Sequence, residues 1–266
     1  MDSRLAGRHA LITGGGTGIG AAVARRLVAD GYRVMVSGRR EAPLREIADE
    51  LGCGWVTGDT ADPDQAEAVV ARAAEEFGGL DGLVCNAGIS RSGTVMEQTP
   101  EGWGAVLATN LTGAFLICRA ALPHLVRSRG SIVAMSSLAA LRAAPASAAY
   151  CVSKAGMVML MQSIAVDYGP KGVRANAVCP GWVRTDMADQ AMDEVAGMRG
   201  TDREGAYRRV HRLMPTPRPA ETSEVSGLVS WLLSPAAGYV NGAAIPVDGG
   251  LSVLDLGLIE FAENQS

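Results

Sequence analysis

Short apolar runs alternate with longer amphipathic stretches along most of the chain. The short runs hold four or five residues rich in Val, Ile, Leu and Ala, which predicts buried strands. In the longer stretches, apolar residues recur every three or four positions, as at Ile19, Val23 and Leu27, which predicts helices. Regular alternation of strand and helix predicts a Rossmann-type doubly wound parallel sheet with helices on both faces.

The predicted strands cover residues 9–13, 33–37, 54–57, 82–85, 131–135, 174–178 and 244–247. The predicted helices cover residues 18–30, 41–51, 62–77, most of 103–127, 149–168 and 222–233. Neither a linker nor an internal repeat divides the chain, so residues 1–266 are predicted to form one domain. Residues 185–219 show no clear period. They are predicted to form a substrate lid, or alternatively an ordinary surface excursion with short helices.

Composition narrows the class of protein. Of 266 residues, 48% are hydrophobic and 20% are charged, which is typical of a soluble globular protein. The net charge is −4, and the pairs Arg39-Arg40 and Arg208-Arg209 are too short to form a nucleic-acid-binding track. We therefore expect a small-molecule partner and no nucleic acid.

Cysteine usage and the apolar runs indicate the compartment. The five cysteines are scattered and form no C-x-x-C, which predicts free thiols in a reducing compartment. The three histidines lack metal-ligand spacing, and no metal site is expected. The first apolar run is too short for a secretion signal, and no run reaches the roughly 20 apolar residues of a membrane span. The expected location is the cytoplasm, with no membrane partner.

A glycine-rich turn joins the first predicted strand to the first helix. Its sequence, from Thr13 to Gly20, has the spacing G-x-x-x-G-x-G. Glycines let the backbone approach a pyrophosphate, and the helix N-terminus offers free N–H groups. A nucleotide site is expected here, with contacts from Gly14, Thr17, Gly18 and Ile19.

The end of the second strand bears on the choice between NAD and NADP. Gly38, Arg39 and Arg40 stand where a carboxylate would bind the ribose 2′-hydroxyl of NAD. Guanidinium groups suit a 2′-phosphate, so NADP(H) is favoured and NAD(H) is the alternative. The two arginines could otherwise form a solvated helix start.

Other predicted strands also end in residues suited to a cofactor. Carboxyl ends of parallel strands form the ligand-binding edge of such sheets. The expected cofactor contacts there are Asp59, Thr60, Asn86, Ala87, Gly88, Pro180, Gly181, Val183 and Thr185. Asp59 could equally be a turn residue.

Tyr150 and Lys154 carry the strongest chemical signal. Residues four apart share one face of a helix, so an amine is expected close to a phenol. A positive charge favours the ionised phenol, which could then exchange a proton with an alcohol or ketone near neutral pH. Alone, the pair would usually mean a solvated helix face; the glycine turn and Ser137 make the chemical interpretation stronger.

Together these residues resemble the short-chain dehydrogenase/reductase family from His9 to about Gly250. The matching pieces occur in family order: T-G-x-x-x-G-x-G at 13–20, Asn86-Ala87-Gly88, Asn110, Ser137, Tyr150-x-x-x-Lys154, Pro180-Gly181 and Val247-Asp248-Gly249-Gly250. The resemblance implies that Tyr150 is the acid or base. It implies that Lys154 holds the nicotinamide ribose and lowers the pKa of the tyrosine, and that Ser137 binds the substrate oxygen. Asn110 would help to hold a water linked to Lys154. Both Tyr150 and Lys154 would also contact the cofactor.

The sequence leaves the substrate open. Candidate pocket residues are mostly apolar, and a hydrophobic ketone or secondary alcohol fits them: Ser90, Leu138, Ala139, Trp182, Met187, Met192 and Met198. The methionines could equally pack a core or lid. A 3-oxoacyl thioester reductase is the alternative enzyme. It would need a basic patch, for which Arg91, Arg142, Arg184, Arg199 and Arg203 are available. A nucleotide-binding sensor or scaffold is the non-enzymatic alternative. The intact Asn110, Ser137, Tyr150 and Lys154 argue against it. Neutral Thr17, where the family pattern for NADP would favour a basic residue, weakens the NADP expectation.

Assembly is the last expectation. The helix predicted at 149–168 carries apolar residues on more than the one stripe that faces its own sheet, Val158 and Met159 among them. The family resemblance implies that such helices pair in a homotetramer or homodimer. The alternative is that the chain after Thr185 covers these additional apolar residues within one subunit.

Overall fold

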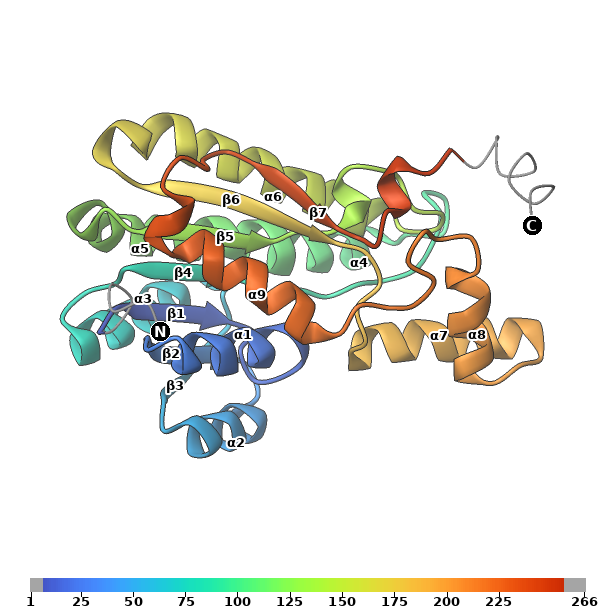
Figure 1. Ribbon diagram of the computed structural model, residues 1–266, viewed down its shortest axis with the longest axis horizontal. Coiled ribbons are helices and arrows are strands. Elements are labelled where there is room, and N and C mark those ends of the chain that lie inside the picture. The colour runs from blue at the N-terminus through green and yellow to red at the C-terminus, as the bar shows by residue number, and fades with distance from the viewer. Residues whose placement is uncertain (1–6, 256–266) are drawn as a thin grey trace.

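The computed structural model describes residues 7–255, which form a seven-stranded, entirely parallel sheet with helices on both faces (Figure 1). The strands are β1 (His9–Thr13), β2 (Arg33–Gly38), β3 (Gly54–Thr57), β4 (Gly82–Cys85), β5 (Ser131–Met135), β6 (Arg174–Pro180) and β7 (Ala244–Val247). Their order is β3-β2-β1-β4-β5-β6-β7. The prediction of a Rossmann-type doubly wound fold is confirmed. Residues 1–6 and 256–266 of the predicted single domain lie outside the described residues.

The helices follow the strands along the chain. They are α1 (Gly18–Ala29), α2 (Glu41–Leu51), α3 (Pro63–Phe77), α4 (Pro100–Leu107), α5 (Gly113–Ser128), α6 (Ala148–Tyr168), α7 (Asp186–Arg199), α8 (Arg203–His211) and α9 (Thr222–Leu233). Short 3₁₀ turns occupy Leu138–Ala140, Gly169–Lys171, Pro235–Ala237 and Leu251–Val253. Asp62 caps α3, because its carboxylate accepts hydrogen bonds from the backbone N–H groups of Asp64 and Gln65, both at 3.0 Å.

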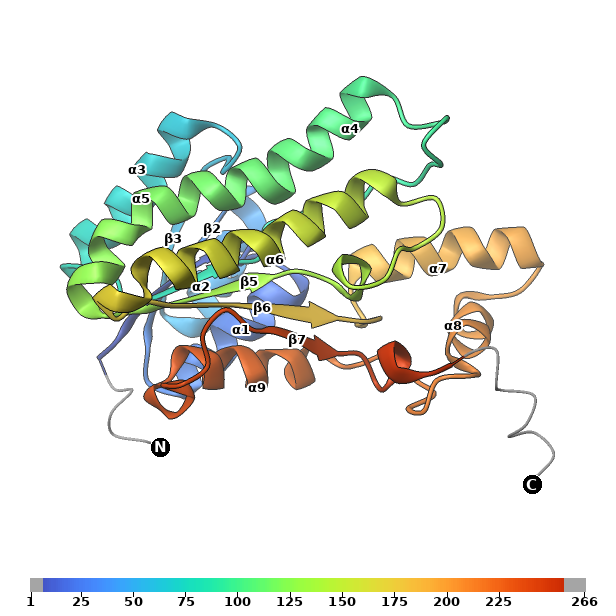
Figure 2. The ribbon, with the colours of Figure 1, turned by 90° about the horizontal axis from the view of Figure 1, so that it is seen from above.

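The central strands are apolar throughout because helices cover both of their faces. Leu11 of β1 pairs with Met35 of β2 on one side and with Leu83 of β4 on the other. On one face, α3, α5 and α6 share a core with Leu11 and Leu83. On the other face, α1, α2 and α9 share a core with Ile12 and Val84. Figure 2 shows these two helical layers above and below the sheet.

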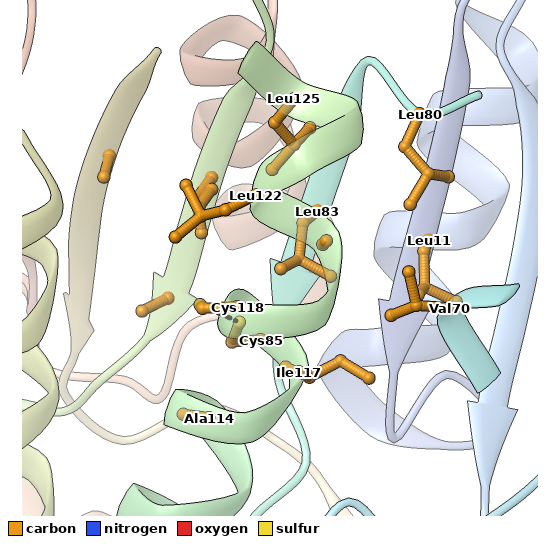
Figure 3. Packing of buried hydrophobic residues seen from close by; sticks show 14 of the residues in the cluster. Leu11, Val70, Leu80, Leu83, Cys85, Ala114, Ile117, Cys118, Leu122 and Leu125 are labelled. Carbon is orange, nitrogen blue, oxygen red and sulfur yellow. Dashed lines mark hydrogen bonds between the residues drawn. The ribbon is translucent and has the colours of Figure 1, made fainter. Parts of the chain in front are cut away.

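The core beneath α5 is tightly packed, as Figure 3 shows. Leu83 is fully buried, as are Leu125 and Ile132. Cys85 and Cys118 lie side by side there, with their sulfur atoms 3.5 Å apart. Both are free thiols, so this part of the chain is held together by packing.

The segment between α4 and α5 differs from the continuous helix that the sequence predicts. Helix α4 begins at Pro100, earlier than predicted, with the Thr99 hydroxyl as its N-cap. A π-helical turn at Ala108–Thr112 then separates α4 from α5. Such turns are rare and are frequently found at functional sites, and this one contains Asn110.

The unpatterned stretch 185–219 contains two helices, α7 and α8, at the carboxyl end of the strands (Figure 1). They share a small core of Met192, Ala196, Ala206 and Tyr207, separate from the two sheet cores. Arg203 of α8 joins the two helices through ion pairs with Asp189 at 3.3 Å and Asp193 at 2.6 Å. The short helices match the local structure of the alternative, and the lid role stays a prediction.

Two helical stretches are long and apolar enough to cross a membrane by length and composition alone, contrary to the expectation from the sequence. They are Pro100–Ser128, which runs through the π-helical turn, and Ala148–Lys171. Both lie along one face of the sheet and contribute residues to its core (Figure 2). Core helices of ordinary globular proteins meet the same criteria, so this feature is weak evidence for a membrane span.

Candidate active site

The carboxyl ends of β1, β4, β5 and β6 bring distant parts of the chain to one edge of the sheet. The glycine turn follows β1, Asn86 follows β4, Ser137 lies just beyond β5, and β6 ends at Pro180. Parallel strands place all their carboxyl ends together, and this is where ligands bind in such folds. The candidate site is therefore built from segments more than 160 residues apart in sequence, which the sheet holds side by side.

The glycine turn has a backbone path and packing that require glycine. Gly14 and Gly18 adopt positive φ angles of 62° and 54°. A Cβ atom at Gly20 would lie 2.2 Å from the Gly14 carbonyl oxygen and 2.5 Å from Asn86 Nδ2, so a side chain cannot fit there. Thr17 is the N-cap of α1 in extended conformation, and within residues 7–255 its side chain makes no capping hydrogen bond. The first N–H groups of α1 are thus available to an anion.

Asn86 fixes the shape of the glycine turn. Its Nδ2 donates to the carbonyl oxygens of Thr13 at 3.1 Å and Gly14 at 2.9 Å. In return, the Thr13 hydroxyl accepts hydrogen bonds from the backbone N–H groups of Asn86 at 3.0 Å and Ala87 at 3.1 Å. The Asn86 side chain therefore holds β1 to β4. The sequence did not indicate this role for Thr13, although Thr13 is the last residue of the first strand and begins the glycine motif.

Arg39 and Asp59 meet at the ends of β2 and β3. Arg39 Nη1 lies 3.8 Å from Asp59 Oδ2, and both side chains are at least one-third exposed. Asp59 also accepts a hydrogen bond from Ala61 N, and Gly38 O accepts one from Gly58 N at 3.0 Å. Thr60 is buried, and a Cβ atom at Gly113 would lie 2.7 Å from its hydroxyl. The sequence assigned Arg39 and Asp59 separate contacts; the fold makes them an ion pair.

Ser137, Tyr150 and Lys154 converge between β5 and the start of α6. The Tyr150 hydroxyl is hydrogen-bonded to the side chain of Ser137. Lys154 Nζ lies over the tyrosine ring, 5.6 Å from its centroid. The ammonium is buried, donates to the Met135 carbonyl oxygen at 2.7 Å and lies 3.6 Å from Met157 Sδ. The adjacent Ser136 points elsewhere and donates to the Lys154 carbonyl oxygen.

Burial disfavours the charged forms of both Lys154 and Tyr150 and therefore shifts both pKa values. It lowers the pKa of Lys154 to about 8. It also raises the pKa of Tyr150, an effect that the hydrogen bond from Ser137 partly offsets. The expectation that Lys154 lowers the pKa of the tyrosine is not met, because burial of the phenol raises its pKa and only the Ser137 hydrogen bond acts to lower it.

Asn110 joins the π-helical turn to helix α6 and to the loop after β4. Its Oδ1 accepts from Ile89 N at 2.8 Å, and its Nδ2 donates to Ile89 O at 2.9 Å and to Ser153 Oγ at 3.0 Å. Ser153 in turn donates to Tyr150 O at 2.8 Å. A Cβ atom at Gly88 would lie 3.4 Å from both Asn110 Oδ1 and Lys154 Nζ, which places these groups near one another. Sequence reasoning missed Ser153, although it lies three residues after Tyr150 on the same helix.

The segment after β6 lies beside the glycine turn and borders the candidate site. Gly181 packs against Asp248, and Val183 is buried in the core shared by α1 and α9. Thr185 is the N-cap of α7, and its Cγ2 would lie 3.4 Å from a Cβ atom at Gly18. The structure thus brings Thr185 to the glycine turn, as expected for two segments that face one ligand.

Several candidate pocket residues lie elsewhere. Trp182 and Met192 pack into the small core of α7 and α8, whereas Met198 is 74% exposed and Met187 is 46% exposed. Leu138 and Ala139 form the 3₁₀ turn that directly follows Ser137 and are half-buried beside the site, and Ser90 is exposed. The interpretation of Met192 as a packing residue is therefore correct.

Comparison with known proteins agrees with this geometry. A family model described as enoyl-(acyl carrier protein) reductase matches residues 14–252. The chain is 39% identical to protein MoaE of Klebsiella aerogenes over 270 residues, covering 96% of this chain and 99% of that protein. It is 38% identical to a granaticin polyketide synthase putative ketoacyl reductase of Streptomyces violaceoruber, covering 91% and 92%. A variant of actinorhodin polyketide ketoreductase, solved with NADPH, superposes with a TM-score of 0.90 at 34% identity, covering 96% and 100% of the two chains.

The buried ammonium gives a pH prediction. Below about pH 8 Lys154 is charged in both the folded and the unfolded chain, and the folded protein carries the full cost of its burial. As the pH rises above about 8, the folded protein loses this proton before the unfolded chain does, so stability rises with pH. Lys154→Met should therefore raise the urea midpoint of the ligand-free protein more at pH 7 than at about pH 9.5. The exposed Lys171→Met is the matched control, and an equal gain at both pH values for Lys154→Met would contradict the lowered pKa.

Proposed function

Because the chain belongs to the short-chain dehydrogenase/reductase family, we propose that it interconverts a secondary alcohol and a ketone with NADP(H) as the hydride carrier. The chain is an NAD(P)-dependent oxidoreductase of this family. The observation that carries the proposal is the convergence of the Ser137 hydroxyl, the Tyr150 phenol and the Lys154 ammonium beside the glycine turn. A phenol, a hydroxyl and an ammonium can together bind a carbonyl or carbinol oxygen and transfer one proton.

The residues present suit a nicotinamide dinucleotide. The tight glycine turn, with positive φ angles at Gly14 and Gly18, and the free N-terminus of α1 suit its pyrophosphate. Gly14, Thr17, Gly18 and Ile19 would hold that group. The other strand-end residues would hold the adenosine and nicotinamide parts: Gly38, Arg39, Arg40, Asp59, Thr60, Asn86, Ala87, Gly88, Pro180, Gly181, Val183 and Thr185. The bound cofactor supplies or accepts the hydride.

In this proposal, each residue handles one part of the proton chemistry. Ser137 donates a hydrogen bond to the substrate oxygen, and Tyr150 gives that oxygen a proton during reduction or takes one during oxidation. Lys154 reaches toward the ribose and, with a pKa of about 8, can both carry charge and exchange a proton near neutral pH. Asn110 holds the start of α6 in place through Ser153. The raised pKa of Tyr150 keeps the phenol protonated, which suits a proton donor in carbonyl reduction.

Arg39 supports the preference for NADP(H). Its guanidinium is at the end of β2, where the ribose 2′ position would lie, and it is 59% exposed and therefore accessible. Asp59 opposes the preference, because its carboxylate pairs with Arg39 and would repel a phosphate. We infer that Arg39 leaves Asp59 to bind a 2′-phosphate. A phosphate can accept two hydrogen bonds from the guanidinium and carries more negative charge than the Asp59 carboxylate.

Reduction of a 3-oxoacyl thioester is the second candidate, and the ketoacyl reductase among the relatives favours it. The carrier of such a substrate would need free cationic groups beside the pocket. Arg184 is instead paired with Glu204 at 2.8 Å, and Arg203 is paired with Asp193 and Asp189. These ion pairs neutralise two of the five arginines available for a basic patch, which favours a small, uncharged ketone or secondary alcohol over a carrier-bound substrate. We further propose a cytoplasmic location for the protein. We also propose that residues 185–219, which lie at the carboxyl end of the strands, act as a substrate lid.

Exposed apolar residues on α6 support assembly with a second copy of the chain. Val152, Met159 and Val166 are spaced seven apart, so they lie on one face of α6, and they are 48%, 61% and 74% exposed. Phe115 on the neighbouring helix α5 is 47% exposed. The segment after Thr185 leaves this face uncovered. We propose that α5 and α6 pair with the same helices of a second copy in a homodimer or homotetramer.

The first prediction concerns the proton donor. Tyr150→Phe should lower kcat by roughly 10²–10⁴-fold, because it removes the acid while the packing of the ring remains. NADPH oxidation with acetophenone and with ethyl acetoacetate measures the loss, and binding of NADPH should stay near its wild-type value. Tyr168→Phe at the far end of α6 is the control. A Tyr150→Phe enzyme with near-wild-type turnover would remove this residue from the mechanism.

The second prediction concerns cofactor choice. Arg39→Ala should raise KM for NADPH by roughly tenfold or more and change KM for NADH little, because one charge-assisted interaction is lost. Asp59→Asn should shift the ratio in the opposite direction by removing the competing carboxylate. Arg45→Ala, on the exposed face of α2, is the control. Equal effects of Arg39→Ala on the two cofactors would show that Arg39 does not read the 2′-phosphate.

The third prediction concerns assembly. Met159→Glu combined with Val166→Glu should shift the protein to monomers, because two carboxylates would be desolvated at the paired face. Light scattering at micromolar concentration gives the mass of each form. Met198→Glu, an equally exposed site on α7, should leave the mass unchanged. A wild-type protein that is monomeric and fully active at this concentration would rule the assembly out.

A further inference from the structure

The chain after β7 folds into a turn that Asp248 holds from within; we refer to residues 247–252 as the Asp248 turn. Asp248 Oδ1 accepts a hydrogen bond from Gly250 N at 3.1 Å, and Oδ2 accepts one from Ser252 N at 2.7 Å. Both carboxylate oxygens are thus used on backbone N–H groups of this turn. Hydrogen bonds to an ionised acceptor are stronger than neutral ones, so one side chain sets the path of the whole segment.

The Asp248 turn packs directly against the loop that follows β6. Gly181 N donates to Val247 O at 3.0 Å. A Cβ atom at Gly181 would lie 3.1 Å from Asp248 Cα and 3.2 Å from its Cβ, so the two backbones touch with no side chain between them. Any shift of the turn must therefore move Pro180 and Gly181, which form the nicotinamide side of the proposed cofactor site.

The same turn also supports the segment by which the chain leaves α8. Thr216 N donates to Gly249 O at 3.0 Å. Gly249 and Gly250 have φ angles of 61° and 88°, and a Cβ atom at Gly250 would lie 2.9 Å from Pro215 Cγ. The exit of the lid is therefore docked on two glycines of the turn, and a side chain at Gly250 would push it away.

A third contact reaches the loop that carries Ser137. The Arg142 guanidinium donates to the Ser252 carbonyl oxygen at the end of the turn. Between Ser137 and Arg142, the backbone is held by hydrogen bonds from Ala140 N to Ser137 O at 2.9 Å and from Arg142 N to Leu138 O at 3.0 Å. These hydrogen bonds connect Ser252, through Arg142, to the segment that directly follows Ser137.

We propose that Asp248 is a positioning residue for the reaction: by holding one turn, it fixes the Pro180–Gly181 loop, the lid exit at Pro215–Thr216 and, through Arg142, the loop that follows Ser137. The inference rests on the proposed function for its catalytic consequence. Its structural part stands independently, on contacts of the ligand-free protein. Without the carboxylate, two backbone N–H groups lose their acceptor, and the three segments lose their common support.

Kinetic comparison tests the catalytic part. Asp248→Ala should lower kcat/KM for acetophenone by roughly 10- to 100-fold, because small misplacements of reacting groups have large effects on rate. Asp248→Asn keeps one acceptor oxygen and should fall between Asp248→Ala and wild type. Asn241→Ala is the matched control: Asn241 lies at the other end of β7, and its Oδ1 accepts from Ala175 N at 2.8 Å, far from the site. Its kcat/KM should stay within about twofold of wild type, because it positions no reacting group.

Hydrogen exchange of the ligand-free variants decides the structural part, even if acetophenone proves not to be a substrate. Asp248→Ala should speed exchange about tenfold in residues 138–142, 180–184 and 213–220, as expected when charge-assisted hydrogen bonds that oppose local opening are lost. Asn241→Ala should not. Arg142→Ala should speed exchange in 138–142 alone, which tests the third contact should Asp248→Ala fail to fold. Unchanged exchange in these segments in Asp248→Asn and Arg142→Ala would overturn the proposal. Failure of the kinetic arm alone, with wild type inactive, would count against the proposed function instead.

Discussion

The site depends on burying one ammonium group, that of Lys154, between α6 and the carboxyl ends of the strands. A buried charge is costly unless acceptors surround it. Here the Met135 carbonyl oxygen is its hydrogen-bond acceptor, the sulfur of Met157 lies nearby, and burial lowers the pKa of the amine to about 8. A ligand that brought hydroxyl oxygens to this group would reduce the cost. The fold thus holds a cation in a place where ligand binding can stabilise it.

Holding that cation in place requires several elements that do no chemistry themselves. Asn110 binds both polar groups of the Ile89 backbone and reaches Ser153, so the π-helical turn, the loop after β4 and α6 move together. Thr13 and Asn86 likewise lock the glycine turn to β4. These hydrogen bonds are buried or partly buried, where an unpaired partner is costly, and they therefore fix the candidate site more firmly than exposed contacts could.

Electrostatic pairing divides the surroundings of the site into two regions. Beside α7 and α8, Arg184 pairs with Glu204 and Arg203 pairs with Asp189 and Asp193, and the two helices keep a core of their own. At the adenosine end, Arg39 has only a long contact of 3.8 Å with Asp59 and stays accessible. Exposed pairs of this kind contribute little to stability, so their effect is on which ligand charge each region accepts. The face of α6 that carries Val152, Met159 and Val166, in contrast, exposes apolar side chains.

The sequence by itself determined the order of strands and helices, because buried parallel strands and amphipathic helices have distinct periods. It also predicted the pair Tyr150 and Lys154 from helical spacing, and the family resemblance added Ser137. It failed where contacts rather than periods decide. Helices α7 and α8 pack against each other in a small core of their own and not against the sheet, and the π-helical turn at Asn110 has no period of its own. The ion pair of Arg39 with Asp59, the burial that raises the pKa of Tyr150, and the support that Asp248 gives to three segments all join residues far apart in the chain. Only the tertiary structure decides such features, because they arise from which surfaces the parallel sheet places in contact.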